Sequence, residues 1–137
     1  MGVRGPGRIA FLGGPPGSKV AGCHGTSYPI SNKAINAATT YTSGDLRDGT
    51  HVALNAVGIW LMIFGTPALA ADWLFIDSAD DTPDGYSSRV LGPGADQIGH
   101  NCVPVRLGTG ANAGKIKIKA AARNWSAVYG WPVGYWT

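Results

Sequence analysis

The sequence predicts an all-β fold: a single β-sandwich or jelly-roll-like domain with an extended N-terminal arm. Glycine and proline are frequent, at 21 and 9 of the 137 residues. Glutamate is absent and glutamine occurs once, although both commonly fill helix surfaces. Short apolar segments alternate with turn residues along most of the chain, as in proteins built from many short strands. Long amphipathic helices are therefore not expected.

Residues 1–44 are predicted to form the extended arm. They contain Gly-Pro-Gly and Gly-Gly-Pro-Pro-Gly motifs and no sustained hydrophobic period. A segment of this composition buries little apolar surface and loses much chain entropy on ordering. We therefore expect it to become ordered by lying on a neighbouring subunit, and we expect the compact β domain to span residues 45–137.

The first strands of the compact domain are expected within its longest apolar run, residues 49–78. Asp48-Gly49 is a turn signal that predicts a following strand at residues 50–54. Gly58 and a Gly-Thr-Pro turn cut the run into pieces of strand length. Bulky and β-branched residues fill these pieces, which predicts strands at residues 59–64 and 72–77.

Two other interpretations of the apolar run stay open. Residues 52–71 carry no charged side chain and are about as long as a helix that spans a bilayer, which would make the chain a small membrane protein. The Asn, Gly and Pro residues inside this span and the lack of a basic cluster beside it oppose that interpretation. In the second, residues 59–64 are the apolar core of a signal peptide and small residues follow as its cleavage site.

The later strands are expected in the second half of the chain. A long polar connection, residues 77–99, contains a short predicted strand at residues 88–91. Another strand is expected at residues 102–107, where Pro104 indicates a sheet edge or a bulge. Counting these, we expect seven or eight strands in total.

The segment Lys115-Ile116-Lys117-Ile118-Lys119 alternates strictly between charged and apolar residues. It predicts a strand with isoleucines inward and lysines outward. Lysines in this pattern are typical of an exposed sheet edge that must not pair with another chain. A face that binds phosphate or acidic groups is the alternative.

The charges are segregated along the chain, whose net charge is +3. All eight aspartates fall in residues 45–96, and the segments on either side carry basic residues but no acid. Such segregation could steer one copy's ends onto another copy's middle; ordinary solvated loops are the alternative.

Lysines 115, 117 and 119 with Arg123 and Trp125 resemble the mixture of basic residues and an aromatic ring found in proteins that bind single-stranded nucleic acid. A pI near 9.0 is modest for nucleic-acid binding.

The C-terminal segment 125–136 is rich in aromatic residues. These rings are expected to close the core, to anchor a subunit contact, or to stack on sugars. The candidate sugar-stacking residues are Trp125, Trp131 and Trp136. The predicted interface residues are Phe11, Leu12, Trp125, Tyr129, Trp131, Tyr135 and Trp136.

Candidate metal and phosphate sites are weak. Asp80 and Asp84 lie in a loop that resembles the opening of a calcium site, but the twelfth position is Leu91 instead of glutamate. Cys23-His24 and His100-Asn101-Cys102 have spacings too short for the usual zinc sites. The glycine-rich segment 108–114 lacks the Lys-Ser/Thr ending of a phosphate loop. No cofactor is expected.

The sequence predicts a non-enzymatic structural protein. It has no nucleophile elbow and no glutamate to act as a general acid. We expect a subunit of a virus particle, such as a phage capsid cement, decoration or tail protein, that assembles in the host cytoplasm and binds copies of itself and other subunits. No small-molecule substrate, nucleic acid or membrane is expected as a partner. The alternative is a carbohydrate- or receptor-binding β module.

Overall fold

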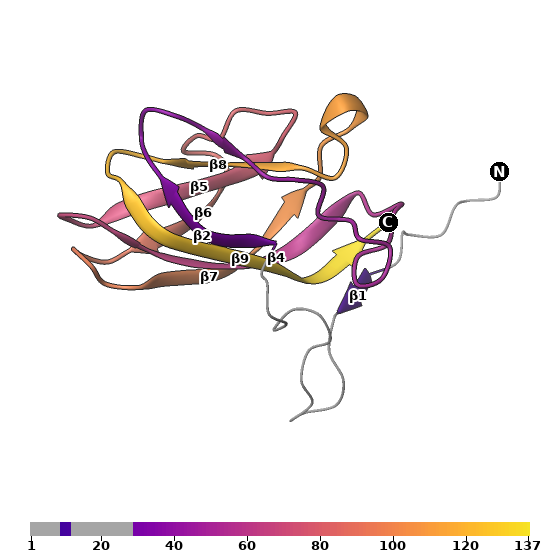
Figure 1. Cartoon of the computed structure of the whole chain (residues 1–137), viewed down its shortest axis with the longest axis horizontal. Coiled ribbons are helices and arrows are strands. Elements are labelled where there is room, and N and C mark those ends of the chain that lie inside the picture. The colour runs from indigo at the N-terminus through magenta and orange to yellow at the C-terminus, as the bar shows by residue number, and fades with distance from the viewer. Residues whose placement is uncertain (1–8, 12–28) are drawn as a thin grey trace, which may run out of the picture.

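The computed structural model describes residues 9–11 and 29–137, which form two antiparallel sheets packed as a sandwich (Figure 1). Sheet A contains β1 (Ile9–Phe11), β2 (Ile30–Ile35), β4 (Gly58–Pro67), β7 (Gly99–Arg106) and β9 (Trp125–Trp136). Sheet B contains β3 (Tyr41–Thr42), β5 (Asp72–Ser78), β6 (Ser88–Gly92) and β8 (Ile116–Ala120). The short 3-10 helix η1 (Gly110–Asn112) lies between β7 and β8.

The strand pairing is that of a jelly roll. Four antiparallel pairs are nested along the chain: β2 with β9, β3 with β8, β4 with β7, and β5 with β6. These pairs make one long ribbon that folds into the sheet orders β2-β9-β4-β7 and β3-β8-β5-β6. Two sheets built in this way are the jelly-roll arrangement. The predicted all-β sandwich or jelly-roll-like fold is confirmed.

The central apolar run forms strands because its side chains alternate between core and surface. In β4 the buried residues Ile59, Leu61 and Ile63 alternate with the partly exposed Trp60 and Phe64. β5 alternates in the same way. Strands at residues 59–64 and 72–77 are therefore confirmed, and the same residues are neither a helix nor an isolated apolar segment.

No helix in the part of the chain that the structure describes is long and apolar enough to cross a membrane. Half of the segment that would have to span it, residues 58–67 of 52–71, is the inner strand β4 of sheet A.

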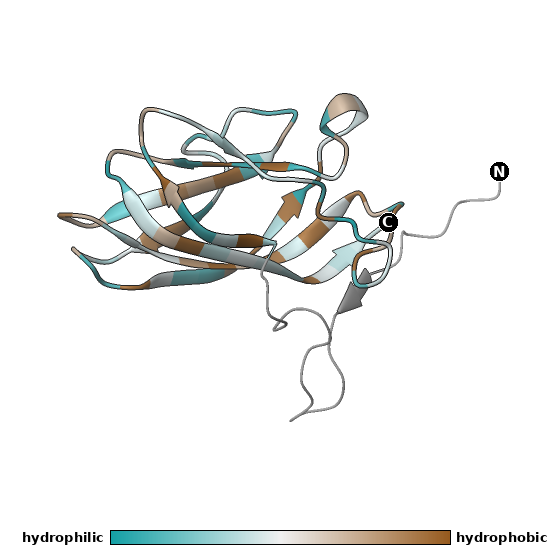
Figure 2. Cartoon of the chain, in the orientation of Figure 1, coloured by the Kyte–Doolittle hydropathy of each residue, from teal (hydrophilic) through white to brown (hydrophobic). Residues whose placement is uncertain are grey.

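The core lies between the two sheets and is filled by aliphatic side chains from both. Figure 2 shows apolar and polar residues alternating along the strands, as expected when one face of each sheet is buried. In β8, Ile116 and Ile118 are fully buried, while Lys117 and Lys119, which alternate with them, face outward. The largest fully buried aliphatic residues are Ile30, Ile35, Ile59, Leu61, Ile63, Leu74, Ile76, Leu107, Ile116 and Ile118.

Residues 30–42, assigned to the arm by the sequence analysis, contribute strands to both sheets. Ile30 and Ile35 are 0% and 1% exposed and β2 pairs with β9, so the compact part of the chain begins at or before Ile30. Two register shifts and a positive φ at Asn32 interrupt the alternation of β2. Its sequence therefore lacks the apolar–polar alternation from which a strand is predicted. β1 pairs with the C-terminal end of β9 in the same chain.

Two local predictions were wrong. Residues 50–54 form a loop instead of a strand, because Oδ1 of Asp48 accepts the backbone N–H groups of Thr50, His51 and Val52. The lysine strand β8 is not a sheet edge: it lies between β3 and β5. Pro104 does lie in an edge strand, since β7 pairs only with β4 among the described strands.

Candidate functional site

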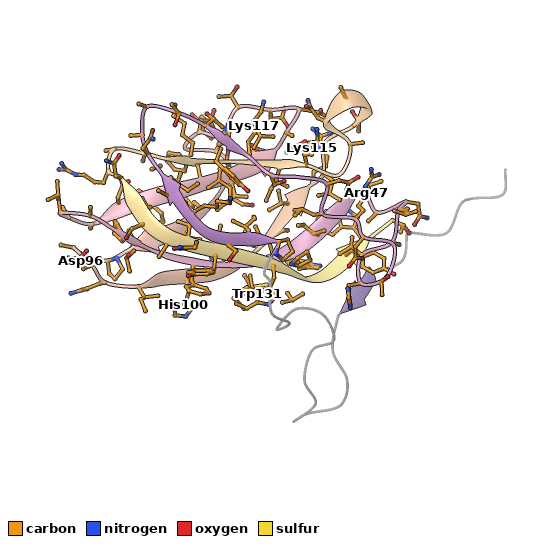
Figure 3. The ribbon with its side chains drawn as sticks, viewed as in Figure 1. Arg47, Asp96, His100, Lys115, Lys117 and Trp131 are labelled. Atoms are coloured by element: carbon orange, nitrogen blue, oxygen red, sulfur yellow. The ribbon has the colours of Figure 1, made fainter. Side chains whose placement is uncertain are left out.

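The outer face of sheet A carries a continuous group of large apolar side chains, here called the aromatic face. Alternation in β4 points Trp60, Met62 and Phe64 away from the core, and the cross-strand register sets them beside β9. Figure 3 shows Trp131 on this outer side of the sandwich. The aromatic face consists of Trp60, Met62, Phe64, Tyr129, Trp131 and Trp136.

Phe64 is at the centre of a ring cluster on this face. Its ring is stacked on that of Tyr129, with centroids 5.1 Å apart and an interplanar angle of 16°. Its contact with Trp131 is edge-on, at 5.8 Å and 79°. Trp60 and Trp136 form a second edge-on pair at 6.0 Å. Each such pair contributes about 0.5–1.5 kcal/mol beyond the area it buries, so the rings are held in place. Phe64 and Tyr129 are partly exposed, whereas Trp131 is buried.

The edge strand β7 extends the aromatic face with smaller residues. His100, Cys102 and Pro104 lie opposite Phe64, Met62 and Trp60 in the sheet register, and all three are exposed. Burial of part of the thiol raises the pKa of Cys102, which keeps it protonated and weakly nucleophilic at neutral pH.

No disulfide joins Cys102 to another residue that the structure describes. Cys23 and His24, which the zinc alternative requires, lie outside the described residues.

Two of the predicted interface residues face inward instead. Trp125 is 1% exposed and belongs to the core, so its ring can neither contact a neighbour nor stack on a sugar. Tyr135 packs against the same core. Tyr129, Trp131 and Trp136 lie on the aromatic face, where Tyr129 and Trp136 are partly exposed and Trp131 is only 8% exposed. Of the candidate sugar-stacking residues, Trp131 and Trp136 share that face and Trp125 does not.

The predicted interface residues in the arm are described only in part. The backbone of Phe11 pairs with Gly134 at the end of β9. Leu12 lies outside the described residues.

Asp72, which the sequence analysis did not single out, holds the buried ring of Trp125. Its Oδ2 accepts a hydrogen bond from Nε1 of Trp125 at 3.1 Å and from the backbone N–H of Arg123 at 2.9 Å. The backbone N–H of Ala122 donates to Oδ1 at 3.1 Å. Asp72 is 6% exposed, and its hydrogen bonds fix the turn between β8 and β9.

The acidic loop uses its carboxylates for internal contacts. Asp80 Oδ2 accepts the backbone N–H and the hydroxyl of Thr109 at 2.9 and 2.8 Å, and Oδ1 accepts Asn112 Nδ2. The hydrogen bonds from Thr109 and Asn112 lower the pKa of Asp80. Asp84 accepts the backbone N–H of Tyr86. Within the described residues no three His, Cys or Asp side chains are close enough to hold a metal ion.

An open cavity of about 450 Å³ lies at one end of the sandwich, lined in part by Arg47, Arg106 and Thr109. Its charged groups are already paired. Arg47 donates to both oxygens of Asp45 and to the carbonyl of Leu54; these hydrogen bonds lower the pKa of Asp45 and raise that of Arg47. Arg106 pairs with Asp81 at 2.9 Å. The cavity therefore offers little to an anionic ligand.

Comparisons with protein-family models, with curated proteins and with solved structures found no match to this chain. The function must therefore be argued from the chemistry of its surfaces.

Proposed function

We propose that this chain is a non-enzymatic structural subunit of a larger assembly, a virus particle, and that it binds copies of itself through the aromatic face of sheet A. The observation that carries the proposal is the ring cluster around Phe64, which lies on the outside of the sandwich. A solvated sheet face normally carries polar residues at these positions. Rings held in place before binding lose little conformational freedom in an interface.

The composition of the face favours a second copy as its occupant. β4 and β9, which form its centre, contain no Asp, Glu, Lys or Arg. Two such faces can meet without burying a charge, which would be costly. A two-fold contact uses the same patch on both subunits, and an uncharged aromatic patch is compatible with itself.

The jelly-roll fold supports the choice of a virus particle by analogy alone. Viral capsid domains are among the proteins built on this fold, and lectins are too. The carbohydrate-binding alternative is less favoured, because Trp125 lies in the core and the carboxylates of the acidic loop are bound within the chain.

The proposal is tested by measuring mass in solution by sedimentation, without detergent, for the natural chain and for Phe64→Asp. We expect a discrete oligomer for the natural chain. The carboxylate of Phe64→Asp would have to be buried in the interface, so this variant is expected to sediment as a monomer.

Tyr86→Asp is the matched control. Tyr86 is 99% exposed in a loop, so this substitution should leave the oligomer unchanged. Circular dichroism shows whether each variant keeps its β structure. A natural chain that is monomeric at all concentrations, or an oligomer that survives Phe64→Asp, would contradict the proposal.

A further inference from the structure

The outer face of sheet B combines cations with aromatic rings, unlike the uncharged aromatic face on the other side. Figure 3 shows Lys115 and Lys117 on the side of the sandwich opposite to Trp131 and His100. In the register of the sheet, Phe75 of β5 has Lys119 of β8 on one side and Arg89 of β6 on the other. Trp73 lies two residues from Phe75 and faces the same way.

Trp73 is an exposed ring at one end of this face. It is 37% exposed, although β5 is an inner strand of sheet B. The guanidinium carbon of Arg89 lies over the indole, 4.6 Å from the ring centroid. This cation–π contact orients both groups. We call Trp73, Phe75, Arg89 and Lys119 the cationic face.

The positive charge on the cationic face is not neutralised locally. Lys119 and Arg89 form no ion pair with any residue in the part of the chain that the structure describes. Arg123 is also exposed, and the turn that carries it is held against the Trp73 end of β5 by Asp72 and by the Ala121–Trp73 backbone bond. Arg89 thus contacts the exposed indole, Lys119 lies beside Phe75, and Arg123 is on the adjoining turn.

The other end of sheet B is different. Lys117 lies opposite Asp77 in the register and its ammonium donates to the carbonyl of Asp81 at 3.2 Å. Lys115 donates to the carbonyl of Ala111. An anionic ligand is thus favoured only at the Trp73 end.

We propose that the cationic face binds single-stranded nucleic acid. Bases would stack on Phe75 and, once Arg89 moves from the indole to a phosphate, on Trp73. Lys119 and Arg123 would contact further phosphates. Proteins that bind single strands combine stacking rings with a positive surface in this way. Side chains two residues apart on a strand are roughly 6.6 Å apart, about twice the 3.4 Å rise of a stacked strand. A strand whose successive bases are unstacked to about that spacing could place one base on each ring.

The sequence analysis grouped the lysines with Trp125 and did not expect nucleic acid as a partner. Trp125 is buried in the core, so that grouping was wrong. The ring beside the cations is Trp73, which is far from them in sequence and is brought there by the pairing of β5 with β8 and β6.

The test is fluorescence anisotropy of a labelled oligonucleotide of about ten nucleotides, titrated with the full chain at low ionic strength. The natural chain is expected to bind the single strand, with an affinity that falls as salt rises because phosphate contacts release counterions. Trp73→Ala is expected to weaken binding at least about fivefold, and Trp73→Phe to restore most of the loss. Lys119→Ala should reduce the slope of log affinity against log salt by about 0.7.

Two control variants match these changes. Tyr86→Ala removes an exposed ring elsewhere, and Lys115→Ala removes a lysine of the same segment that lies outside the cationic face; both should leave the affinity close to that of the natural chain. Circular dichroism confirms that each variant is folded.

The proposal is overturned if no single strand binds at low salt, if Trp73→Ala binds as well as the natural chain, or if a duplex of equal length binds equally tightly. A sulfated polysaccharide that competes with the oligonucleotide and binds Trp73→Ala undiminished would also overturn it, since charge alone would then be recognised. None of these outcomes bears on the oligomer proposed above, which uses the opposite sheet.

Discussion

Asp72 links the surface turn between β8 and β9 to the core. Its carboxylate accepts two backbone N–H groups of the turn and the indole N–H of Trp125. A buried carboxylate is costly unless donors surround it, and these three donors compensate for that cost. The same contacts hold Trp125 inside the sandwich and Arg123 outside it.

We expect Asp72→Ala to lower the free energy of unfolding by about 3 kcal/mol, because it leaves the buried indole N–H and two backbone N–H groups without their acceptor. Urea denaturation measures this. Asp81→Ala is the control. It breaks only the ion pair with Arg106, in which the Arg106 side chain is 60% exposed and that of Asp81 is 48% exposed. This variant should lose less than about 1 kcal/mol of stability. Equal losses in the two variants would contradict the assigned role of Asp72.

Asp48 is expected to make the fold sensitive to acid. Partial burial raises the pKa of its carboxyl, but hydrogen bonds from Val52, His51 and Thr50 together lower it well below 3.8, its ordinary value. The ionised form therefore stabilises the folded state above the ordinary pKa, and this contribution is lost as the pH falls toward the folded-state pKa. The midpoint temperature of thermal unfolding should fall as the pH is lowered from about 5 to about 2.

Asp48→Asn isolates this contribution. The amide oxygen can still accept the backbone N–H groups but does not titrate, so the variant should show a smaller fall of the midpoint over the same pH range. Asp96→Asn is the control, since Asp96 is exposed at the far end of the molecule in Figure 3. A variant at Asp48 with the same pH dependence as the natural chain would refute the assignment.

At the scale of the strands, regular alternation was predictable and irregular pairing was not. β4, β5 and β8 follow period-2 patterns, and their residues were correctly assigned to strands. β2 was missed because register shifts break its pattern. Whether a strand is an edge depends on pairing between distant segments, which is why β8 was wrongly placed at an edge.

The aromatic face was predictable only in part, because the pairing of β9 is irregular. Residues 125, 129, 131 and 135 would share one face of a regular strand. Two register shifts between β4 and β9, one of them beside Ala127 with its positive φ, turn Trp125 and Tyr135 inward and leave Tyr129 and Trp131 outside. The β4 part of the face, Trp60, Met62 and Phe64, could have been found from the alternation within the apolar run.

Gly99 allows β7 to approach the end of β6 closely. A Cβ at this position would lie 2.3 Å from the backbone carbonyl oxygen of Leu91, and backbone in a sheet cannot easily move away. We expect Gly99→Ala to destabilise the fold by about 1–3 kcal/mol, as overpacking does. Gly85→Ala, where nothing lies within 4 Å, is the control for urea denaturation. A Gly99→Ala variant no less stable than Gly85→Ala would contradict the close approach.

At the scale of the whole molecule, the sandwich separates two surfaces of different chemistry. The aromatic face lies on sheet A, where β4 and β9 contain no Asp, Glu, Lys or Arg. The cationic face lies on sheet B. A core about 10 Å thick lies between the two sheets. Under the two proposals above, a subunit with this organisation would bind its own copies on one side and an anionic strand on the other.

The two faces should therefore respond independently to substitution. Phe64→Asp is expected to abolish the oligomer and to leave the affinity for a short oligonucleotide within about twofold of the natural value, while Trp73→Ala does the reverse. Effects at distant sites without shared partners are usually additive, and the double variant should show both losses. The oligonucleotide must be short enough to occupy one copy, because a longer strand bridging several copies would bind more tightly to an oligomer. If Phe64→Asp weakened binding of the short strand as much as Trp73→Ala, the ligand would contact both sheets or require the assembled form, and the separation of the two faces would be wrong.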